Sequence, residues 1–363
     1  MIKYCYIHIP FCSKICSYCD FCKMLNYDKF IDTYLDALEE EIKTIYKGDT
    51  LDTIYIGGGT PSCLNIKQLK RLFEILNIFK RSNNFEFTIE GNFESTDLDK
   101  LKLYKEYGIN RLSFGIETIN NKYLEYLNRS LDLNEVEKVL ENCRELGFNN
   151  INVDLMYAID EESIKDLEID LDYVLSLNVE HISTYSLIIE DHTILGINKT
   201  DNIDPDLDDD MYKCICNKLK DNGYIHYEIS NFCKEGYESR HNNSYWANEN
   251  YYGFGLGASS YIENRRTTNT RSLNHYKLKR YPKEIEYLDI NSMMEYEVIL
   301  NLRRNTGIDL KLFKEKYDKE LSEVYNYKRL IGLGLLKEEN NHLIIPEDKW
   351  YISNYILTCI LGE

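Results

Sequence analysis

The chain has 363 residues, which is enough for two or three domains and for a sizeable buried core. Its 43 Lys and Arg residues against 61 Asp and Glu residues give a formal net charge of -18, which disfavours general binding to nucleic acid or anionic lipid. Hydrophobic residues make up 43% of the chain, a composition that excludes a disordered protein.

From Tyr4 to about residue 222, short runs rich in β-branched residues alternate with amphipathic helical stretches, the pattern of βα units around a parallel sheet. The sequence contains six such units. The predicted strands are residues 4–9, 53–56, 85–89, 111–116, 151–156 and 181–187. The predicted helices lie at about 29–46, around 69–76, from 97 to 108, in a pair ending at Gly147, and at about 164–177 and 207–222.

Six βα units are too few for an eight-unit barrel but suit an α/β fold with a partial (βα)6 barrel, and an open doubly wound sheet is the structural alternative. Both architectures bind ligands at the carboxyl ends of their strands. We therefore expect the chemistry in the segments that directly follow each strand.

The rest of the chain is predicted to form two further regions after a first domain of residues 1–222. Residues 223–290 show a less regular hydrophobic pattern and are predicted to form a linker or accessory region. Residues 291–363 read as a small winged-helix-like domain in a C-terminal α+β region, with helices at 295–304, 310–317 and 321–331 and a ribbon near 343–345. Because residues 290–363 hold 10 Lys and Arg against 12 Asp and Glu, we expect a packing or partner-contact module and no DNA binding.

The cysteines cluster in one place. The sequence has no run of 18 apolar residues and no secretory signal, which predicts a cytoplasmic protein without a transmembrane segment and disfavours disulfides among its 11 cysteines. Four of them stand in Cys12-Ser-Lys-Ile-Cys16-Ser-Tyr-Cys19-Asp-Phe-Cys22, directly after the first strand. Thiolates this close together can hold one iron–sulfur cluster or a zinc ion. Zinc is the weaker hypothesis, because structural zinc sites prefer paired C-x2-C halves and the second half is absent; four unrelated buried cysteines are weaker still.

Further candidates follow the next strands. Gly57-Gly58-Gly59-Thr60-Pro61-Ser62 comes after the second strand, where glycines permit close backbone approach to a ligand, although such a turn alone is weak evidence. Polar residues that are costly to bury without a partner stand in or beside the later strands. These residues are Glu90, Asn92, Ser113, Glu117 and Asp154.

The cysteine spacing resembles the C-x3-C-x2-C signature of radical S-adenosylmethionine (SAM) enzymes, met here by Cys12, Cys16 and Cys19. The resemblance implies that three thiolates hold a [4Fe-4S] cluster whose open iron binds SAM. Electron transfer then breaks a carbon–sulfur bond of SAM to give a 5'-deoxyadenosyl radical. Cys22 as a fourth ligand would close the cluster, but two residues beyond Cys19 the chain is expected to be leaving the loop.

Together with Arg129, the glycine turn and the strand-end residues resemble one branch of this superfamily, the oxygen-independent coproporphyrinogen III oxidases and the related haem chaperones. One departure is that this branch usually has Gln where Glu117 stands. The carboxylate of Glu117 can still accept hydrogen bonds from the ribose of SAM. The SAM-pocket residues that the resemblance implies are Tyr6, Gly58, Gly59, Thr60, Glu90, Glu117, Arg129, Asp154 and Ile188.

Segments along nearly the whole chain resemble the haem chaperone (HemW-type) members. They are residues 6–12, 151–157, 181–190, 240–246 and 306–309. The oxidases have a further cysteine where this chain has Phe21, and an N-terminal extension before the first strand, which here begins near residue 4. The stretch Ala158-Ile-Asp-Glu-Glu departs from both groups, which usually have Gly-Leu-Pro at this place.

His241 is the candidate haem ligand that the resemblance implies, within Arg-His-Asn-x-x-Tyr-Trp. Imidazole is a good axial ligand, and Tyr245 and Trp246 offer flat apolar surface. The alternative is a hydrogen-bonded structural histidine, the role also expected for His8. Arginines that could pair with haem propionates, or form a solvated basic turn, are Arg265, Arg266 and Arg271.

Three hypotheses follow. The leading one is a radical SAM-type haem chaperone that binds a [4Fe-4S] cluster, SAM and haem, draws on a one-electron reductant, and passes haem to an acceptor protein, with transient membrane contact allowed during delivery. The alternative is an oxidase that decarboxylates coproporphyrinogen III to protoporphyrinogen IX through the 5'-deoxyadenosyl radical. The third is an electron-transfer protein with a closed cluster, which requires Cys22 as a ligand.

Overall fold

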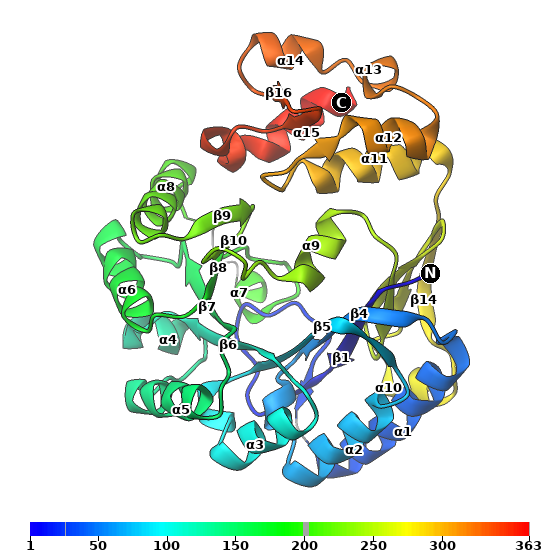
Figure 1. Cartoon of the computed structure of the whole chain (residues 1–363). Coiled ribbons are helices and arrows are strands. Elements are labelled where there is room, and N and C mark those ends of the chain that lie inside the picture. The colour runs from blue at the N-terminus through cyan, green and yellow to red at the C-terminus, as the bar shows by residue number, and fades with distance from the viewer. Residues whose placement is uncertain (26, 199–202, 363) are drawn as a thin grey trace.

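A computed structural model describes residues 1–25, 27–198 and 203–362 (Figure 1). Its centre is a curved sheet in which the six predicted strands run parallel, and all six are confirmed. They are β1 (Tyr4–Ile9), β4 (Thr50–Gly58), β5 (Lys80–Gly91), β6 (Arg111–Glu117), β7 (Ile151–Tyr157) and β8 (His181–Ser186). Two short strands, β2 (Phe11–Cys12) and β3 (Met24–Leu25), pair with each other beside β1.

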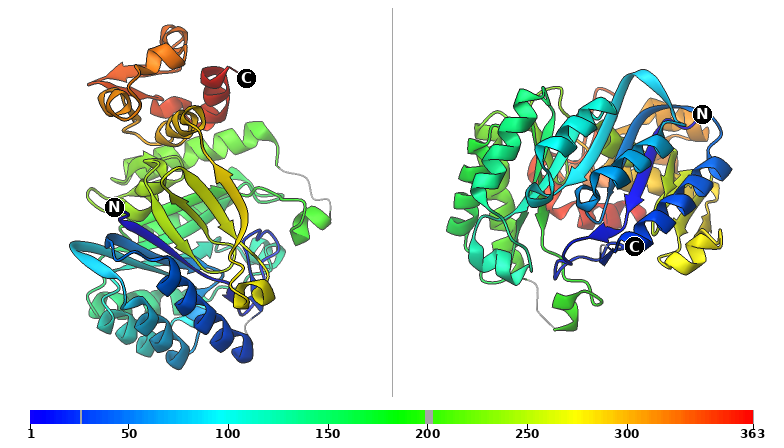
Figure 2. Two further views of the ribbon diagram at one scale, coloured as in Figure 1. Left: turned by 90° about the vertical axis from the view of Figure 1, so that its right-hand side faces the viewer. Right: turned by 90° about the horizontal axis from the view of Figure 1, so that it is seen from below.

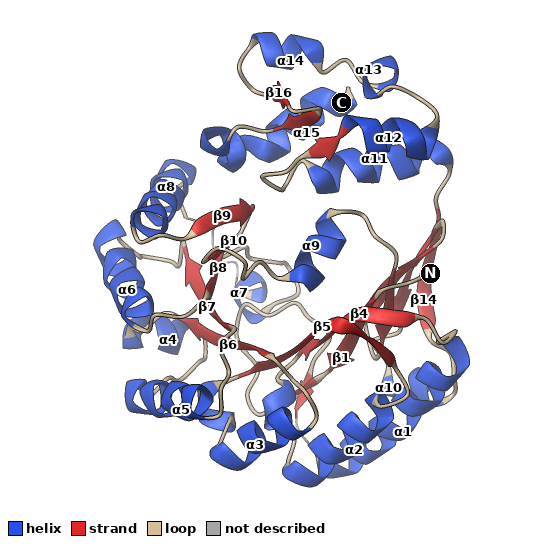
Figure 3. Ribbon diagram, in the orientation of Figure 1, coloured by secondary structure: helices blue, strands red, loops and turns tan. Residues whose placement is uncertain are grey.

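Helices line the outer side of this sheet (Figure 3), and the predicted ones are confirmed within one to three residues. They are α1 (Asp28–Ile45), α2 (Ile66–Leu76), α3 (Leu98–Glu106), α4 (Asn121–Tyr126), α5 (Leu133–Glu145), α6 (Ile164–Ser176) and α8 (Pro205–Asp221), with the short α7 (Ile194–Ile197) before the last. Local signals fix their starts: Asn65 and Gln68 form a reciprocal capping box on α2, and Asp97 accepts from the Lys100 amide on α3.

Residues 225–287 are more regular than the sequence indicated, because they contribute six strands to the same sheet. These are β9 (Ile225–Glu228), β10 (Asn231–Cys233), β11 (Tyr251–Phe254), β12 (Ser259–Ile262), β13 (Arg265–Asn269) and β14 (Pro282–Tyr287). The full order is β14-β13-β12-β11-β1-β4-β5-β6-β7-β8-β10-β9. Two helices, α9 (Arg240–Trp246) and α10 (Leu273–Lys277), join these strands, and α9 lies in the opening of the incomplete barrel (Figure 1).

The C-terminal residues form a small unit above the barrel, on the opposite side from the cysteine loop (Figure 2). Its elements are α11 (Ile290–Asn301), β15 (Ile308–Asp309), α12 (Leu310–Tyr317), α13 (Leu321–Val324), α14 (Lys328–Gly332), β16 (Lys337–Glu339), β17 (His342–Ile344) and α15 (Ser353–Leu361). The single helix predicted at 321–331 is wrong, because Tyr325 takes an extended conformation and divides it into α13 and α14. The predicted ribbon is present as part of a three-stranded sheet.

None of the helices in the described ranges combines the length and the hydropathy needed to cross a membrane.

A buried carboxylate joins the helical layer to the added strands. Glu41 of α1 is fully buried and accepts from Tyr276 Oη (2.5 Å), the Gly255 amide (2.8 Å) and Asn269 Nδ2 (2.6 Å). Burial raises its pKa to about 7, an effect that these donors reduce. One side chain therefore connects α1, α10 and the ends of β11 and β13.

We expect Glu41→Ala to lower the free energy of unfolding by about 3 kcal/mol, because three buried donors lose their acceptor. Urea unfolding followed by circular dichroism measures the change. The matched control is Glu40→Ala, whose carboxylate pairs with Lys279 at the surface and whose loss should leave the midpoint nearly unchanged. Equal effects of the two variants would contradict the structural role of Glu41.

Candidate functional site

The cysteine loop begins at the carboxyl end of β1, as parallel strands lead us to expect. Contacts from distant segments hold it. The Ser17 amide donates to Leu127 O (3.0 Å) and Asn128 Nδ2 donates to Ile15 O (2.8 Å). Within the loop, Lys23 Nζ donates to the Cys19 carbonyl. The middle of the loop is therefore anchored to residues 127 and 128, and its second half is braced by its own Lys23.

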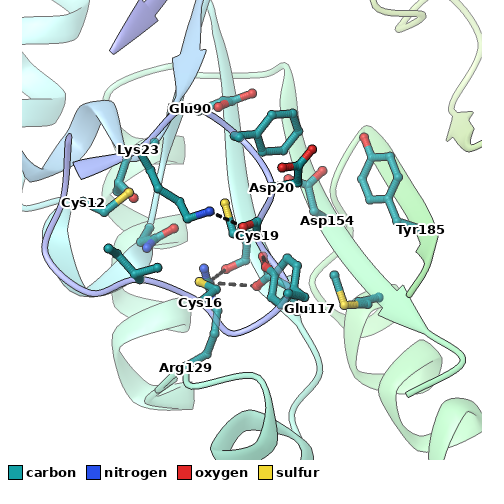
Figure 4. A pocket seen from close by; sticks show the side chains of 18 of the residues that line it. Cys12, Cys16, Cys19, Asp20, Lys23, Glu90, Glu117, Arg129, Asp154 and Tyr185 are labelled. Carbon is teal, nitrogen blue, oxygen red and sulfur yellow. Dashed lines mark hydrogen bonds and ion pairs between the residues drawn. The ribbon is translucent and has the colours of Figure 1, made fainter. Parts of the chain in front are cut away.

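A cavity of about 440 Å³ lies beside this loop, at the carboxyl ends of the parallel strands (Figure 4). Eleven of the thirteen sequence-predicted site residues line it. They are Cys12, Cys16, Cys19, Gly58, Gly59, Thr60, Glu90, Glu117, Arg129, Asp154 and Ile188. Asn92 and Ser113 also line it, whereas Tyr6 and His241 do not.

The glycine turn packs directly against the cysteine loop. A Cβ on Gly59 would lie 2.7 Å from the Phe11 carbonyl oxygen and 2.9 Å from Cys12 Sγ. Gly58 has φ +116°, which favours glycine, and a Cβ there would lie 2.6 Å from the His8 ring. Gly59 is thus required by the close approach of two backbones, and Gly58 by its positive φ and the His8 ring, before any ligand is considered.

Two half-buried carboxylates, Glu90 and Asp154, line the cavity. Glu90 accepts from Tyr55 Oη (2.8 Å) and from the Gly58 amide (3.0 Å), and burial raises its pKa to about 7. Asp154 accepts from Asn152 Nδ2 (2.8 Å), and its pKa is also raised by burial. Both groups lack a cationic partner within salt-bridge distance among the described residues. A cationic ligand in the cavity would therefore stabilise their charged forms.

Glu117 and Arg129 form a buried ion pair at 2.8 Å. Arg129 Nη2 also donates to Gly115 O (3.0 Å), and Tyr18 Oη donates to Glu117 (3.3 Å). Burial raises the pKa of Glu117 to about 7, against the opposing effect of Arg129. Glu117 has φ +60°, beside a register shift between β6 and β7, so the strand end turns its carboxylate into the cavity.

Tyr6 does not line the cavity, but it contacts His8, which in turn contacts the cysteine loop. Tyr6 Oη contacts His8 Nδ1 (3.0 Å), and His8 Nε2 contacts the Cys22 carbonyl (2.7 Å). Because a carbonyl only accepts, His8 Nε2 carries the proton and Nδ1 accepts from Tyr6. Burial lowers the pKa of His8 to about 4, so the ring is neutral. This is the structural role expected for His8.

Cys22 is set apart from the other three cysteines by its packing. It does not line the cavity and packs against Gly257, where an added Cβ would lie 2.5 Å from Cys22 Cβ. This geometry disfavours Cys22 as a fourth cluster ligand. It therefore also disfavours the closed-cluster, electron-transfer hypothesis.

His241 is buried in α9, away from the cavity, with both ring nitrogens bonded to protein groups. Thr53 Oγ1 lies 2.6 Å from Nδ1 and Tyr245 Oη lies 2.8 Å from Nε2. The ring also stacks on Tyr55. For His241 to bind iron, one of its ring nitrogens would have to give up its hydrogen bond. The iron would also have to reach a fully buried side chain. This geometry favours the alternative hypothesis, in which His241 is a hydrogen-bonded structural histidine.

The three arginines considered for propionates lie in different places. Arg271 contacts Asp20 of the cysteine loop, at 3.3 Å to its carbonyl oxygen and 3.7 Å to its carboxylate. Arg266 instead lies between the rings of Tyr261 and Tyr296, and Arg265 is exposed on β13. Only Arg271 of these three adjoins the candidate site.

Several cavity residues had no signal in the sequence beyond their position in a loop or strand. They are Tyr18, Asp20, Lys23, Met156 and Tyr185. Tyr18 stands between Cys16 and Cys19, and Asp20 directly follows Cys19, so their nearness to the candidate cluster site could have been inferred from that spacing alone.

The donor set suits an iron–sulfur cluster better than a single ion. In the described ranges no three His, Cys, Asp or Glu side chains converge on one metal position. A three-cysteine cluster does not require such convergence, because each thiolate binds a different iron at the edge of a larger body. Cys12, Cys16 and Cys19 instead surround one end of the cavity (Figure 4).

Comparison with known families supports this assignment. Residues 6–174 match the family profile described as the radical SAM superfamily, and residues 288–348 match the profile described as the HemN C-terminal domain. The second match covers most of the C-terminal unit that follows β14.

Two curated relatives match over nearly the full chain. The sequence is 39% identical to "Heme chaperone HemW" of Bacillus subtilis (strain 168), with 100% of both chains covered. It is 36% identical to the protein of the same name from Lactococcus lactis subsp. lactis (strain IL1403), covering 97% of this chain and 95% of the relative.

The solved structure of coproporphyrinogen III oxidase (HemN) from Escherichia coli superimposes with a TM-score of 0.87. The match covers 99% of this chain and 90% of that one at 23% identity. This likeness shows the fold, and it confirms the partial barrel over the open doubly wound sheet.

The packing of the glycine turn generates a test. We expect Gly59→Ala to lose most of its cluster on anaerobic reconstitution, because the new methyl group would displace Cys12 or the Phe11 carbonyl. Iron and sulfide analysis with the visible spectrum measures the loss.

The control is Gly332→Ala in α14, where an added Cβ meets no atom within 4 Å. Circular dichroism of the metal-free proteins should be the same for both variants. A Gly59→Ala protein with a full cluster would show that the turn does not constrain Cys12.

Proposed function

The chain belongs to the HemW family of the radical SAM superfamily, and we propose that it is a haem chaperone that holds a [4Fe-4S] cluster and SAM and transfers haem to an acceptor protein. The observation that carries the proposal is that the three motif cysteines, the glycine turn and the buried carboxylates line a single cavity.

Cys12, Cys16 and Cys19 would hold the cluster, and the cavity next to them would take SAM. When bound, the cluster supplies one electron at a time and an iron position open to a further ligand. A one-electron reductant is therefore a required partner. The chain's own contribution is to fix the three thiolates, through the loop anchors at Ser17 and Asn128, and to keep Cys22 away.

The electrostatics of the cavity suit SAM, which carries a sulfonium and an ammonium group. Glu90 and Asp154 are half-buried and form no ion pair within the described residues, and desolvation raises the pKa of each. A bound cation would offset this cost of burial. Gly58 and Gly59 would let the backbone approach the ligand closely. The Glu117–Arg129 ion pair lines the cavity next to Cys16.

The first test concerns the cluster ligands. We expect Cys16→Ala to abolish the iron–sulfur absorption and Cys22→Ala to retain it, because Cys16 lines the cavity and Cys22 does not. EPR of the reduced Cys22→Ala protein should still change on adding SAM, which requires an open iron. A Cys22→Ala protein without a cluster would support the closed-cluster alternative.

The second test concerns haem. Anaerobically reconstituted protein is titrated with haem while the Soret band is followed, and we expect saturation near one haem per chain. Transfer is then measured by mixing the loaded protein with an apo-haem protein and separating the two. If no specific haem binding occurs, coproporphyrinogen III with SAM is the next substrate, and its decarboxylation would establish the oxidase alternative instead.

A further inference from the structure

The histidines of the chain divide into two groups. His8, His181, His226 and His241 are buried. The ring nitrogens of His8, His181 and His241 are all within hydrogen-bond distance of protein groups, and His226 packs between Phe232 and Trp350. The three that solvent reaches are His192, His275 and His342.

Of the exposed three, His192 alone adjoins the cysteine loop. His275 lies in α10 on the outer side of the sheet, and His342 lies on β17 of the C-terminal unit. His192 Nε2 contacts the Asp20 carboxylate, one residue beyond Cys19, and its side chain is 60% exposed. Asp20 itself lines the cavity (Figure 4).

The segment that carries His192 is fixed against the cysteine loop. The Leu195 amide in α7 donates to the Ser17 carbonyl (3.1 Å), and the Leu195 side chain packs in a small apolar cluster with Leu127 and Tyr18. Figure 2 shows α7 beside the loop in both views. The Leu195 contacts, three residues beyond His192, therefore hold this segment beside the cysteine loop.

Large apolar side chains stand exposed on the same two segments. Phe21 of the cysteine loop is 68% exposed, and Ile188, which also lines the cavity, is 68% exposed. Ile194 and Ile197 of α7 are 46% and 70% exposed. Apolar side chains gathered in this way are characteristic of a surface that binds an apolar ligand or partner.

Cationic groups complete the rim. Lys14 and Lys23 line the cavity, and Arg271 reaches Asp20 from the added strands. A flat apolar ligand with an iron centre and carboxylate groups at one edge meets each of these features: imidazole for iron, apolar side chains for the ring, and cations for the carboxylates.

We propose that haem binds at this mouth, with His192 as an axial ligand through Nδ1 and Asp20 as the acceptor that orients the ring. The inference rests on the proposed function, since it names the place where the haem is held. It assigns haem ligation to a residue other than His241. Exposure of the site allows an acceptor protein to approach the ligand directly.

The contact with Asp20 gives this histidine a fixed tautomer. Histidines that bind metals commonly donate their second ring N–H to a carboxylate, which orients the ring and raises its basicity. With Nε2–H donated to Asp20, Nδ1 keeps a free lone pair for iron. Because Asp20 follows Cys19 directly, the haem site and the cluster site share one loop.

The experiment is a haem titration of cluster-loaded wild type, His192→Ala and the matched control His275→Ala. We expect His192→Ala to weaken haem binding on the order of tenfold or more and to shift the Soret band, whereas His275→Ala behaves as wild type. EPR of the reduced His192→Ala protein with SAM should match wild type, which shows that the cluster and fold are intact. Asp20→Asn should keep the ligand but weaken binding less than His192→Ala.

The outcomes separate the two proposals. Failure of wild type to bind haem would contradict the proposed chaperone function. Wild-type binding with an unchanged affinity and spectrum in His192→Ala would overturn the ligand assignment alone. His241→Ala, run alongside with circular dichroism to monitor folding, identifies the other candidate if it removes the haem spectrum while the protein stays folded.

Discussion

No side chain fits between the glycines at the end of β4 and the residues they face in β1 and the cysteine loop, and the geometry of the site depends on this contact. Gly59 lies against the Phe11 carbonyl and Cys12, while Gly58 lies against the His8 ring. His8 in turn holds the Cys22 carbonyl. The two loops therefore form one packed body, in which the position of Cys12 is set by backbone and ring contacts beneath it.

The same packing separates Cys22 from the three cysteines that line the cavity. Cys12, Cys16 and Cys19 lie on the part of the loop that faces the cavity, and Cys22 lies where the chain returns to β3. The His8 contact and the close approach of Gly257 hold that return in place. If the other three thiols hold a cluster as proposed, the packing of Cys22 against Gly257 would leave one iron open to a further ligand.

Much of this arrangement could be predicted from the sequence, since parallel strands place all their carboxyl ends at one edge. The β-branched runs located β1 and β4 to β8, and the residues following them line the cavity. The six strands β9 to β14 were missed because each has only three to six residues. Strands β12 to β14 are also largely polar, with Arg265 and Glu284 exposed. A sequence motif also says nothing of burial: the Arg-His-Asn run indicated a metal-binding imidazole, whereas His241 lies on Tyr55 with both nitrogens bonded.

The mouth of the cavity was equally invisible in the sequence, because it is assembled from two loops that are 170 residues apart. Phe21 and Asp20 come from the cysteine loop, and His192 and Ile188 follow β8. Their meeting depends on the Leu195 contact with Ser17, which draws α7 onto the loop. A loop that orders around a cluster would at the same time order Asp20 and Phe21, so cluster assembly and haem binding are expected to be linked through this one segment. Such linkage is reciprocal: if the cluster increases the affinity for haem by some factor, bound haem must increase the affinity for the cluster by the same factor.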